Sequence, residues 1–217
     1  MIKFYISVVK ENLKSLFTAS YCVIFLVATL VCTKVIALPF ELVVDAGVLI
    51  GIYPFLYCIS DVTIEVWGYK AARMNGLCAL GSVVFTVGAL TLAGILPYVE
   101  DPLGLKNMGN VLSGTLIVSL IAFAMGDWID SRVYHKVRGN FKSIWNRCIV
   151  SSIIGELADA TLFLSIMNVW VWHLEIPLLI ALILVSTTMK LSWEVMVSPL
   201  TVYLAKKIKK YVNEPNR

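Results

Sequence analysis

The stretch NGLCALGSVVFTVGALTLAGILPY, residues 75–98, contains 24 consecutive uncharged residues and decides the fold class of this 217-residue chain. A helix needs about 20 mostly apolar residues to cross the hydrocarbon core of a bilayer. The stretch therefore predicts a membrane-spanning helix, and other long apolar stretches occur on both sides of it.

The composition of the whole chain points the same way. Apolar residues make up 59% of it and charged residues 15%, against about 45–50% and about 25% in soluble domains. Too few polar side chains remain to cover a surface that faces water. The same composition excludes a disordered chain. The net charge of +4 is too small for a protein that binds nucleic acid.

Six transmembrane helices are predicted, in an all-α bundle that forms a single integral membrane domain over residues 1–217. The first helix is expected to stay uncleaved, because its apolar stretch is long for a signal peptide and no clear cleavage site follows it. Pro54 is expected to kink the second helix. The expected helices cover residues 16–36, 46–67, 75–97, 109–130, 148–172 and 176–205.

Fifteen of the 18 Lys and Arg residues fall in four segments, namely the N-terminal arm, the turn between helices two and three, the loop between helices four and five, and the C-terminal tail. Cytoplasmic loops carry an excess of Lys and Arg. We therefore expect a multi-pass protein of the cell membrane with both termini in the cytoplasm. A homodimer and an inverted repeat of two three-helix halves are compatible with this topology, although the two halves share no sequence repeat. The other three loops hold Lys106, Glu41, Asp45, Glu100, Asp101 and Glu175.

Charged residues within or at the edges of the expected spans are the first candidates for a functional site, because each costs about 2.5–3.5 kcal/mol at a helix centre. Residues three or four positions apart share one face of a helix. Three polar faces are therefore expected to turn toward one another or toward a wet cavity rather than toward lipid. The charged pairs on these faces are Asp61 with Glu65, Glu156 with Asp159, and Lys190 with Glu194.

Structural roles are the alternative for the same residues. Lys34 lies near the outer end of its span and is expected to extend to the lipid headgroups. Asp127 and Asp130 would form an interfacial anchor with the basic loop that follows them. Asp61, Glu156, Asp159 and Lys190 would form a buried ion-pair network that locks the bundle without touching a ligand.

No motif of enzyme chemistry is present: the chain has no HExxH, no GxSxG, no P-loop and no Rossmann glycine pattern. The five cysteines occur singly and without a CxxC pair, so neither a metal site nor a disulfide framework is expected. The sequence thus predicts a protein that is not an enzyme and needs no cofactor.

Four segments resemble signatures of the queuosine precursor transporter family, also called the VUT family. Residues 59–73, ISDVTIEVWGYKAAR, are similar to its (T/S)D-x-x-x-E-x-(Y/W)-G-x-x-x-A-R signature. Residues 126–138, GDWIDSRVYHKVR, resemble its G-Q-x-x-D segment and basic run, with Asp127 in place of Gln. Residues 153–166, IIGELADATLFLSI, resemble its S-x-x-x-G-(Q/N)-x-x-D-x-x-x-F segment, with Glu156 in place of the amide. Residues 190–210 are similar to its last helix.

The resemblance implies that the chain imports a small-molecule precursor of the tRNA nucleoside queuosine. The candidates are 7-cyano-7-deazaguanine, 7-aminomethyl-7-deazaguanine and the complete base queuine. The aminomethyl group and the side-chain amine of queuine are cations at neutral pH. Because Glu156 replaces a neutral amide, we expect a preference for a cationic substrate over the neutral nitrile.

Roles for individual residues follow from the chemistry of such a ligand. A guanine-like edge presents two neighbouring N–H donors, and the carboxylate of Asp159 or Glu156 could accept both. Asp61 or Glu65 would pair with the substrate amine. Phe163, one helical turn past Asp159, would stack on the ring, or would instead face lipid or the core. The complete set of expected substrate-binding residues, in which Lys190 balances the acids of the empty site, is Asp61, Glu65, Glu156, Asp159, Phe163, Lys190 and Glu194.

Two other functions are compatible with six helices. One is the substrate-capture subunit of an energy-coupling-factor vitamin importer, which moves its ligand only together with partner ATPases. The small-residue AxxxA contact expected on the first helix of such a subunit is missing, and Ala89 and Ala93 form one on the third helix instead. The other is an assembly or scaffold protein whose buried charges only lock its helices.

Overall fold

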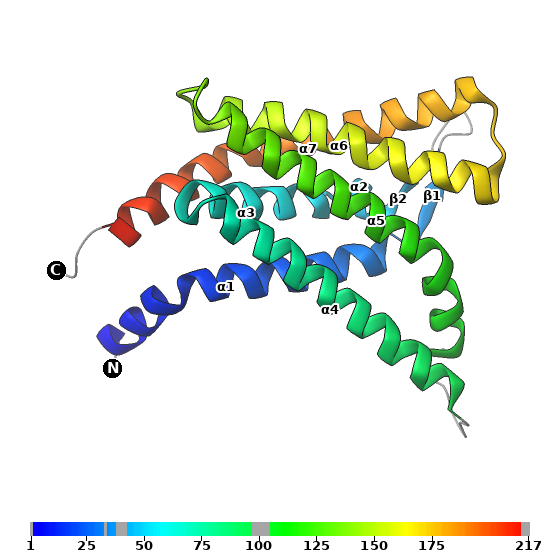
Figure 1. The fold of residues 1–217 in the computed structure, drawn as a ribbon, viewed down its shortest axis with the longest axis horizontal. Coiled ribbons are helices and arrows are strands. Elements are labelled where there is room, and N and C mark those ends of the chain that lie inside the picture. Colours follow the sequence, from blue (N-terminus) through cyan, green and yellow to red (C-terminus); the bar gives the residue numbers. More distant parts are fainter. Residues whose placement is uncertain (1, 33, 38–42, 97–104, 214–217) are drawn as a thin grey trace.

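The computed structural model describes residues 2–32, 34–37, 43–96 and 105–213, and nearly all of this part of the chain is helical (Figure 1). The predicted all-α fold is confirmed, with one small addition near the end of the first helix. The long helices are α1 (Ile2–Val31), α3 (Ile52–Trp67), α4 (Tyr69–Ile95), α5 (Leu105–Val137), α6 (Ile144–Met167) and α7 (Ile176–Asn213). Helix α6 continues into one π-helical turn, Asn168–Trp172.

The added element is a short antiparallel ladder of two strands, β1 (Val35–Ala37) and β2 (Val43–Asp45), in which Val35 lies opposite Asp45. The first helix was expected to reach residue 36, but it ends at Val31. The β-branched pair Val35 and Ile36 suits a strand better than a helix, because branching at Cβ restricts χ1 against the preceding helical turn.

The second expected helix, residues 46–67, is divided into α2 (Ala46–Leu49) and α3 rather than kinked at Pro54. The division lies at Gly51, whose φ of +69° is a left-handed conformation that glycine adopts without strain. A Cβ at this position would lie 2.9 Å from the ring of Trp193 on α7. Pro54 sits in the first turn of α3, where a missing N–H costs no helical hydrogen bond.

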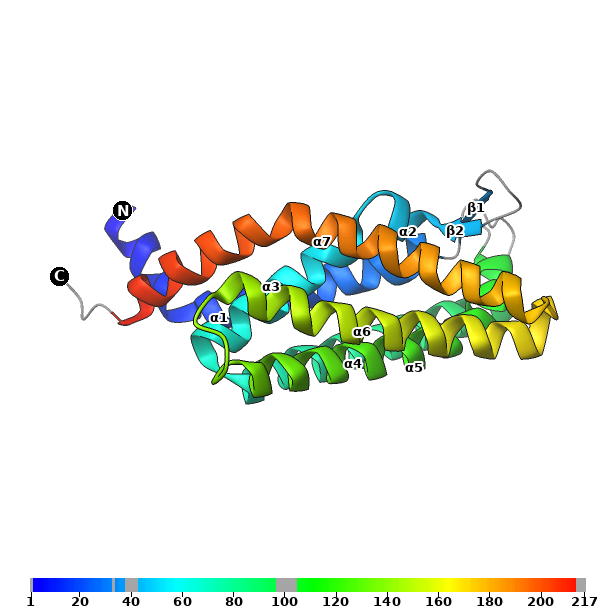
Figure 2. The ribbon, with the colours of Figure 1, turned by 90° about the horizontal axis from the view of Figure 1, so that it is seen from above.

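The four segments rich in Lys and Arg lie at the same end of the bundle. The start of α1, the turn between α3 and α4, the connection between α5 and α6, and the end of α7 all gather there (Figures 1 and 2). The strands β1 and β2 and the connection between α6 and α7 lie at the opposite end (Figure 2). Four basic segments at one end of the bundle are what we expect if all four lie on the same side of a membrane.

The outer surface of the bundle is apolar. Four helical segments of the described chain are long and apolar enough to cross a membrane, namely Asn12–Val31, Tyr69–Ile95, Ile144–Trp170 and Ile176–Val212. Exposed large side chains such as Phe85, Leu92 and Met196 project from them. Apolar residues outside and acids inside are the distribution that a bilayer favours.

Helix α5 packs against α4 and α6, while α7 packs against α3 and α6. A hydrophobic cluster ties α1 to α3, α4 and α5, and in it the rings of Phe25 and Phe123 lie 4.4 Å apart. The interior between α3, α5, α6 and α7 is different, because charged side chains of all four helices are buried there.

Candidate functional site

Seven acids and one lysine are buried in the described part of the chain. They comprise two acids on α3, two on α5, two on α6, and a lysine and an acid on α7. All the charged residues expected at the substrate site are among them, and Phe163 on α6 is half-buried. The buried charged residues are Asp61, Glu65, Asp127, Asp130, Glu156, Asp159, Lys190 and Glu194.

Asp159 and Lys190 form the ion pair at the centre of this set. The Lys190 ammonium donates to the Asp159 carboxylate at 2.5 Å, and both side chains are almost fully buried. The same ammonium lies 4.8 Å from the centre of the Tyr53 ring on α3, a cation–π contact. The pair therefore joins α3, α6 and α7 through one cation.

The position of Asp159 is set by the close crossing of α5 and α6. A Cβ at Gly126 would lie 2.7 Å from the Cβ of Asp159, and a Cβ at Gly155 would lie 2.6 Å from the Cβ of Asp130. The two contacts are reciprocal, since each glycine of one helix receives the aspartate of the other. Only glycine leaves room for this approach.

The two segments at this crossing share a spacing. GDWID at residues 126–130 and GELAD at residues 155–159 both read Gly, acid, two other residues, Asp. Both segments stand out in the sequence, but their spacing alone does not show that each glycine faces the aspartate of the other segment.

Glu156 is buried next to the ion pair, yet neither of its carboxylate oxygens has a hydrogen-bond partner among the described residues. It lies within electrostatic range of Lys190, Asp159 and Glu194. The hydroxyl of Tyr57 on α3 is also buried without a hydrogen-bond partner among these residues, and it lies within electrostatic range of Glu156 and Asp159. Acceptors and a hydroxyl donor thus remain available beside the ion pair.

Asp61, Asp130 and Glu194 form a second group of buried acids, one each from α3, α5 and α7. Their carboxylate oxygens have no hydrogen-bond partner in the described part of the chain. Asp61 lies within electrostatic range of the other two. This group has no cation in contact with it among the described residues.

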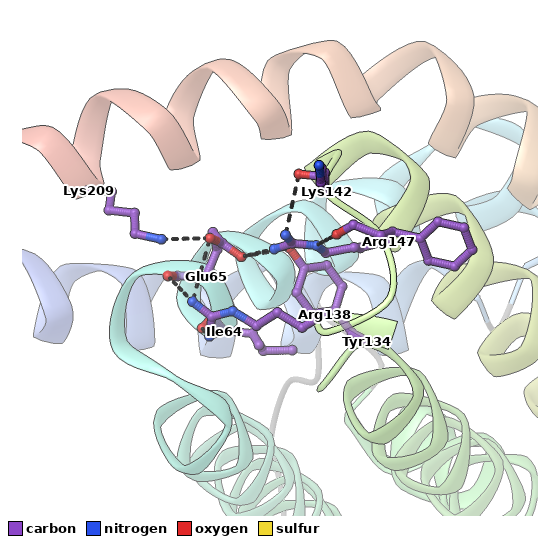
Figure 3. A network of polar contacts seen from close by, with 8 residues as sticks. Ile64, Glu65, Tyr134, Arg138, Lys142, Arg147 and Lys209 are labelled. Carbon is purple, nitrogen blue, oxygen red and sulfur yellow. Dashed lines mark hydrogen bonds and ion pairs between the residues drawn. The ribbon is translucent and has the colours of Figure 1, made fainter. Parts of the chain in front are cut away.

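Glu65 is surrounded by cations at the basic end of the bundle (Figure 3). Its carboxylate lies 2.9 Å from Arg147, 2.7 Å from Lys209 and 3.5 Å from Arg138. The Tyr134 hydroxyl donates to it at 3.4 Å. Arg138 also donates to the backbone carbonyl of Glu65. The network ties the end of α3 to α5, α6 and α7, so Glu65 lies in a different setting from Asp61 one turn away.

Among the described residues, neither Asp127 nor Asp130 forms an ion pair with the basic loop, with which they were expected to form an interfacial anchor. Asp127 accepts a hydrogen bond from the Tyr21 hydroxyl at 2.8 Å, and Asp130 is fully buried. Both lie on a part of α5 that is covered by neighbouring helices on opposite faces. Lys34, expected to extend to the headgroups, is exposed beyond the end of α1.

Asp127 also lines a cavity of about 340 Å³ between α1, α4 and α5. The cavity is mostly apolar and does not include the Asp159–Lys190 pair. Its lining includes Phe25, Arg73, Gly76, Phe123, Asp127 and Trp128.

Comparison with known families places this architecture in context. Residues 45–204 match the model of a family described as "Putative vitamin uptake transporter". The matched region contains every buried charge described above. No curated protein and no solved structure matches the chain.

Proposed function

Since the chain belongs to this family of membrane uptake transporters, we propose that its substrate is a 7-deazaguanine precursor of queuosine, imported for salvage into tRNA. The single observation that carries the proposal is the buried Asp159–Lys190 pair with Glu156 beside it. Such a group offers carboxylate acceptors in a site that lipid cannot reach.

The proposed topology has six spans, with both termini in the cytoplasm and the protein in the cell membrane. It is supported by the gathering of the four basic segments at one end of the bundle (Figure 2). Helix α5 is long enough to span, and α3 contributes a shorter segment that begins after the break at Gly51.

The proposed recognition uses hydrogen bonds in a dry environment, where they are strong. Glu156 or Asp159 accepts the two N–H donors of the guanine-like edge. Asp61 pairs with the cationic amine of the substrate, and Glu194 lies close enough to contribute negative charge. Phe163 on α6 stacks on the ring.

Lys190 balances the acids while the site is empty, and its contact with Tyr53 keeps it at the boundary between α3 and α7. Of the two residues expected to bind the amine, Asp61 is the better candidate. Glu65 is occupied by three cations, so we propose that it holds the basic end of the bundle together (Figure 3).

The test is uptake of labelled queuine and 7-aminomethyl-7-deazaguanine into cells that cannot make queuosine, with queuosine in tRNA as the readout. We expect tRNA modification to depend on the chain and to be lost in Asp159→Asn at equal membrane abundance. Glu175→Gln is the matched control, because Glu175 is an exposed acid between α6 and α7 and should tolerate the change.

Three outcomes would contradict parts of the proposal. Uptake that does not depend on the chain would show that the deazaguanines are not its substrates. Uptake that requires an added ATPase partner would favour the capture subunit of an energy-coupling-factor importer. If Asp159→Asn is folded and fully active, the ion pair only locks the helices and the site lies elsewhere.

A further inference from the structure

The acids buried in the bundle outnumber the cations that could neutralise them. Glu65 has three cations in contact, and Asp127 has the Tyr21 hydroxyl with Arg73 near it. The other five acids share Lys190, the one buried cation of the described residues. An ionised carboxylate that is buried without a partner costs several kcal/mol. Some of these acids therefore need a further positive charge.

Asp130 occupies the centre of the uncompensated group. It lies within electrostatic range of Asp61 on α3, Glu156 on α6 and Glu194 on α7. Its side chain is fully buried, and its Cβ is held against Gly155 by the crossing of α5 and α6. A change of charge at Asp130 would thus be felt on all three neighbouring helices.

Neutral polar side chains lie beside these acids. The Ser152 hydroxyl is fully buried beside Glu194. The Ser151 side chain lies beside Asp130, and the Cys148 side chain lies beside Asp61. A protonated carboxyl is a donor, and a hydroxyl oxygen can accept its hydrogen bond.

The geometry favours a proton over a metal ion as the missing charge. In the part of the chain that the structure describes, no three carboxylates, thiols or imidazoles converge closely enough to hold a metal ion. A metal also needs several oxygen ligands at short distances around one point. A proton needs only one carboxylate oxygen and a neighbouring acceptor.

We propose that Asp130 carries the proton that drives uptake. The Asp130 carboxylate binds a proton while the site faces outward, and it returns that proton to water while the site faces the cytoplasm. An O–H bond forms and breaks, and nothing is oxidised or reduced. Because Asp130 is separate from the Asp159–Lys190 pair, the proton and the substrate can be bound together. The inference rests on the proposed function and adds its energy source.

Titratable groups on five helices lie within electrostatic range of Asp130, and each can influence its proton. They come from α1, α3, α5, α6 and α7. They are Tyr21, Tyr57, Asp61, Asp127, Cys148, Glu156 and Glu194.

The test uses the purified full chain in lipid vesicles with labelled 7-aminomethyl-7-deazaguanine and the membrane potential clamped at zero. Counterflow, the exchange of labelled for unlabelled substrate without an ion gradient, reports binding and movement alone. A gradient of about one pH unit, acid outside, should drive accumulation of about tenfold if one proton moves with each substrate. A sodium gradient should have no effect.

Asp130→Asn should keep counterflow within about twofold and lose the accumulation driven by the pH gradient, because the amide keeps the shape of the side chain but does not bind or release a proton. Asp127→Asn, an acid-to-amide change on the same helix, should keep that accumulation. Full stimulation in Asp130→Asn would overturn the inference. So would a folded Asp130→Asn protein without counterflow, because Asp130 would then be needed for substrate movement itself.

A second measurement on the unchanged protein does not depend on how any variant folds. Addition of substrate to weakly buffered vesicles should make the external medium more alkaline, with about one proton taken up per substrate. Counterflow without this alkalinisation would overturn the proton assignment and leave the proposed function standing. Absence of counterflow in the unchanged protein would instead contradict the proposed function itself.

Discussion

Gly126 on α5 lies directly against Asp159 on α6, so closely that a Cβ at residue 126 would come within 2.7 Å of the Cβ of Asp159. This contact fixes how far Asp159 can project toward Lys190 on α7. The position of the ion pair is therefore controlled from a helix that contributes no atom to it.

The first prediction concerns this contact. Gly126→Ala should push α5 and α6 apart and lengthen the Asp159–Lys190 contact, at a cost of about 1–3 kcal/mol for overpacking. The thermal unfolding midpoint of the protein in detergent should fall by about 2–4 °C per kcal/mol, and uptake should fall with it. Gly81→Ala on α4 is the control, because a Cβ there meets nothing within 4 Å. Equal behaviour of the two variants would count against a tight crossing.

The second prediction separates the two halves of the ion pair. Lys190→Met should destabilise the protein by about 3–5 kcal/mol, because it leaves Asp159 buried without its partner. Lys190→Met combined with Asp159→Asn should recover much of that stability but no uptake. A double variant that transports at the normal rate would show that the pair has only a structural role. Unfolding midpoints and vesicle uptake provide the two readouts.

The third prediction concerns substrate charge. Glu156→Gln should shift preference from 7-aminomethyl-7-deazaguanine toward the neutral 7-cyano compound, because it removes a negative charge from beside the ion pair. Competition between the two compounds for uptake gives the ratio, and a change of about 5- to 30-fold corresponds to about 1–2 kcal/mol. An unchanged ratio of uptake between the two compounds would contradict the proposal that Glu156 favours a cationic substrate.

The fourth prediction ranks the cations around Glu65. Arg147 is 11% exposed and Lys209 is 43% exposed, although their distances to Glu65 are similar at 2.9 and 2.7 Å. Arg147→Gln should therefore cost about 1–3 kcal/mol of stability, whereas Lys209→Gln should cost less than about 1 kcal/mol because water screens that pair. Added salt should reduce the effect of Lys209→Gln further. The unfolding midpoints in low and high salt check both statements, and the reverse ranking would contradict them.

Much of the helical framework could be predicted from the sequence, because uncharged stretches of membrane-spanning length are a strong signal. The starts and ends of the helices were less predictable. The division at Gly51 depends on the ring of Trp193, which comes from a helix far away in the sequence. Helix α5 also continues beyond residue 130 to Val137, and in its last turns Ser131 is buried and Tyr134 packs against residues of neighbouring helices.

The burial of the expected charged residues was predictable, but the contacts between them were not. Spacing along a helix shows that Glu156 and Asp159 share a side, yet it cannot say which of them meets Lys190. That choice depends on how α6 and α7 are rotated about their axes, which the glycine crossing helps to set. Glu65 was expected beside the substrate because it follows Asp61 by one turn. Its nearness to Arg138, Arg147 and Lys209 follows only from the way the helix ends meet (Figure 3).

The reciprocal contact of Gly126 with Asp159 and of Gly155 with Asp130 also limits how this protein can evolve. A larger residue at either glycine is tolerated only if the opposite aspartate shrinks or its helix shifts, and either change disturbs a buried acid. The four positions should therefore change together among related chains, as one inherited unit shared by two helices.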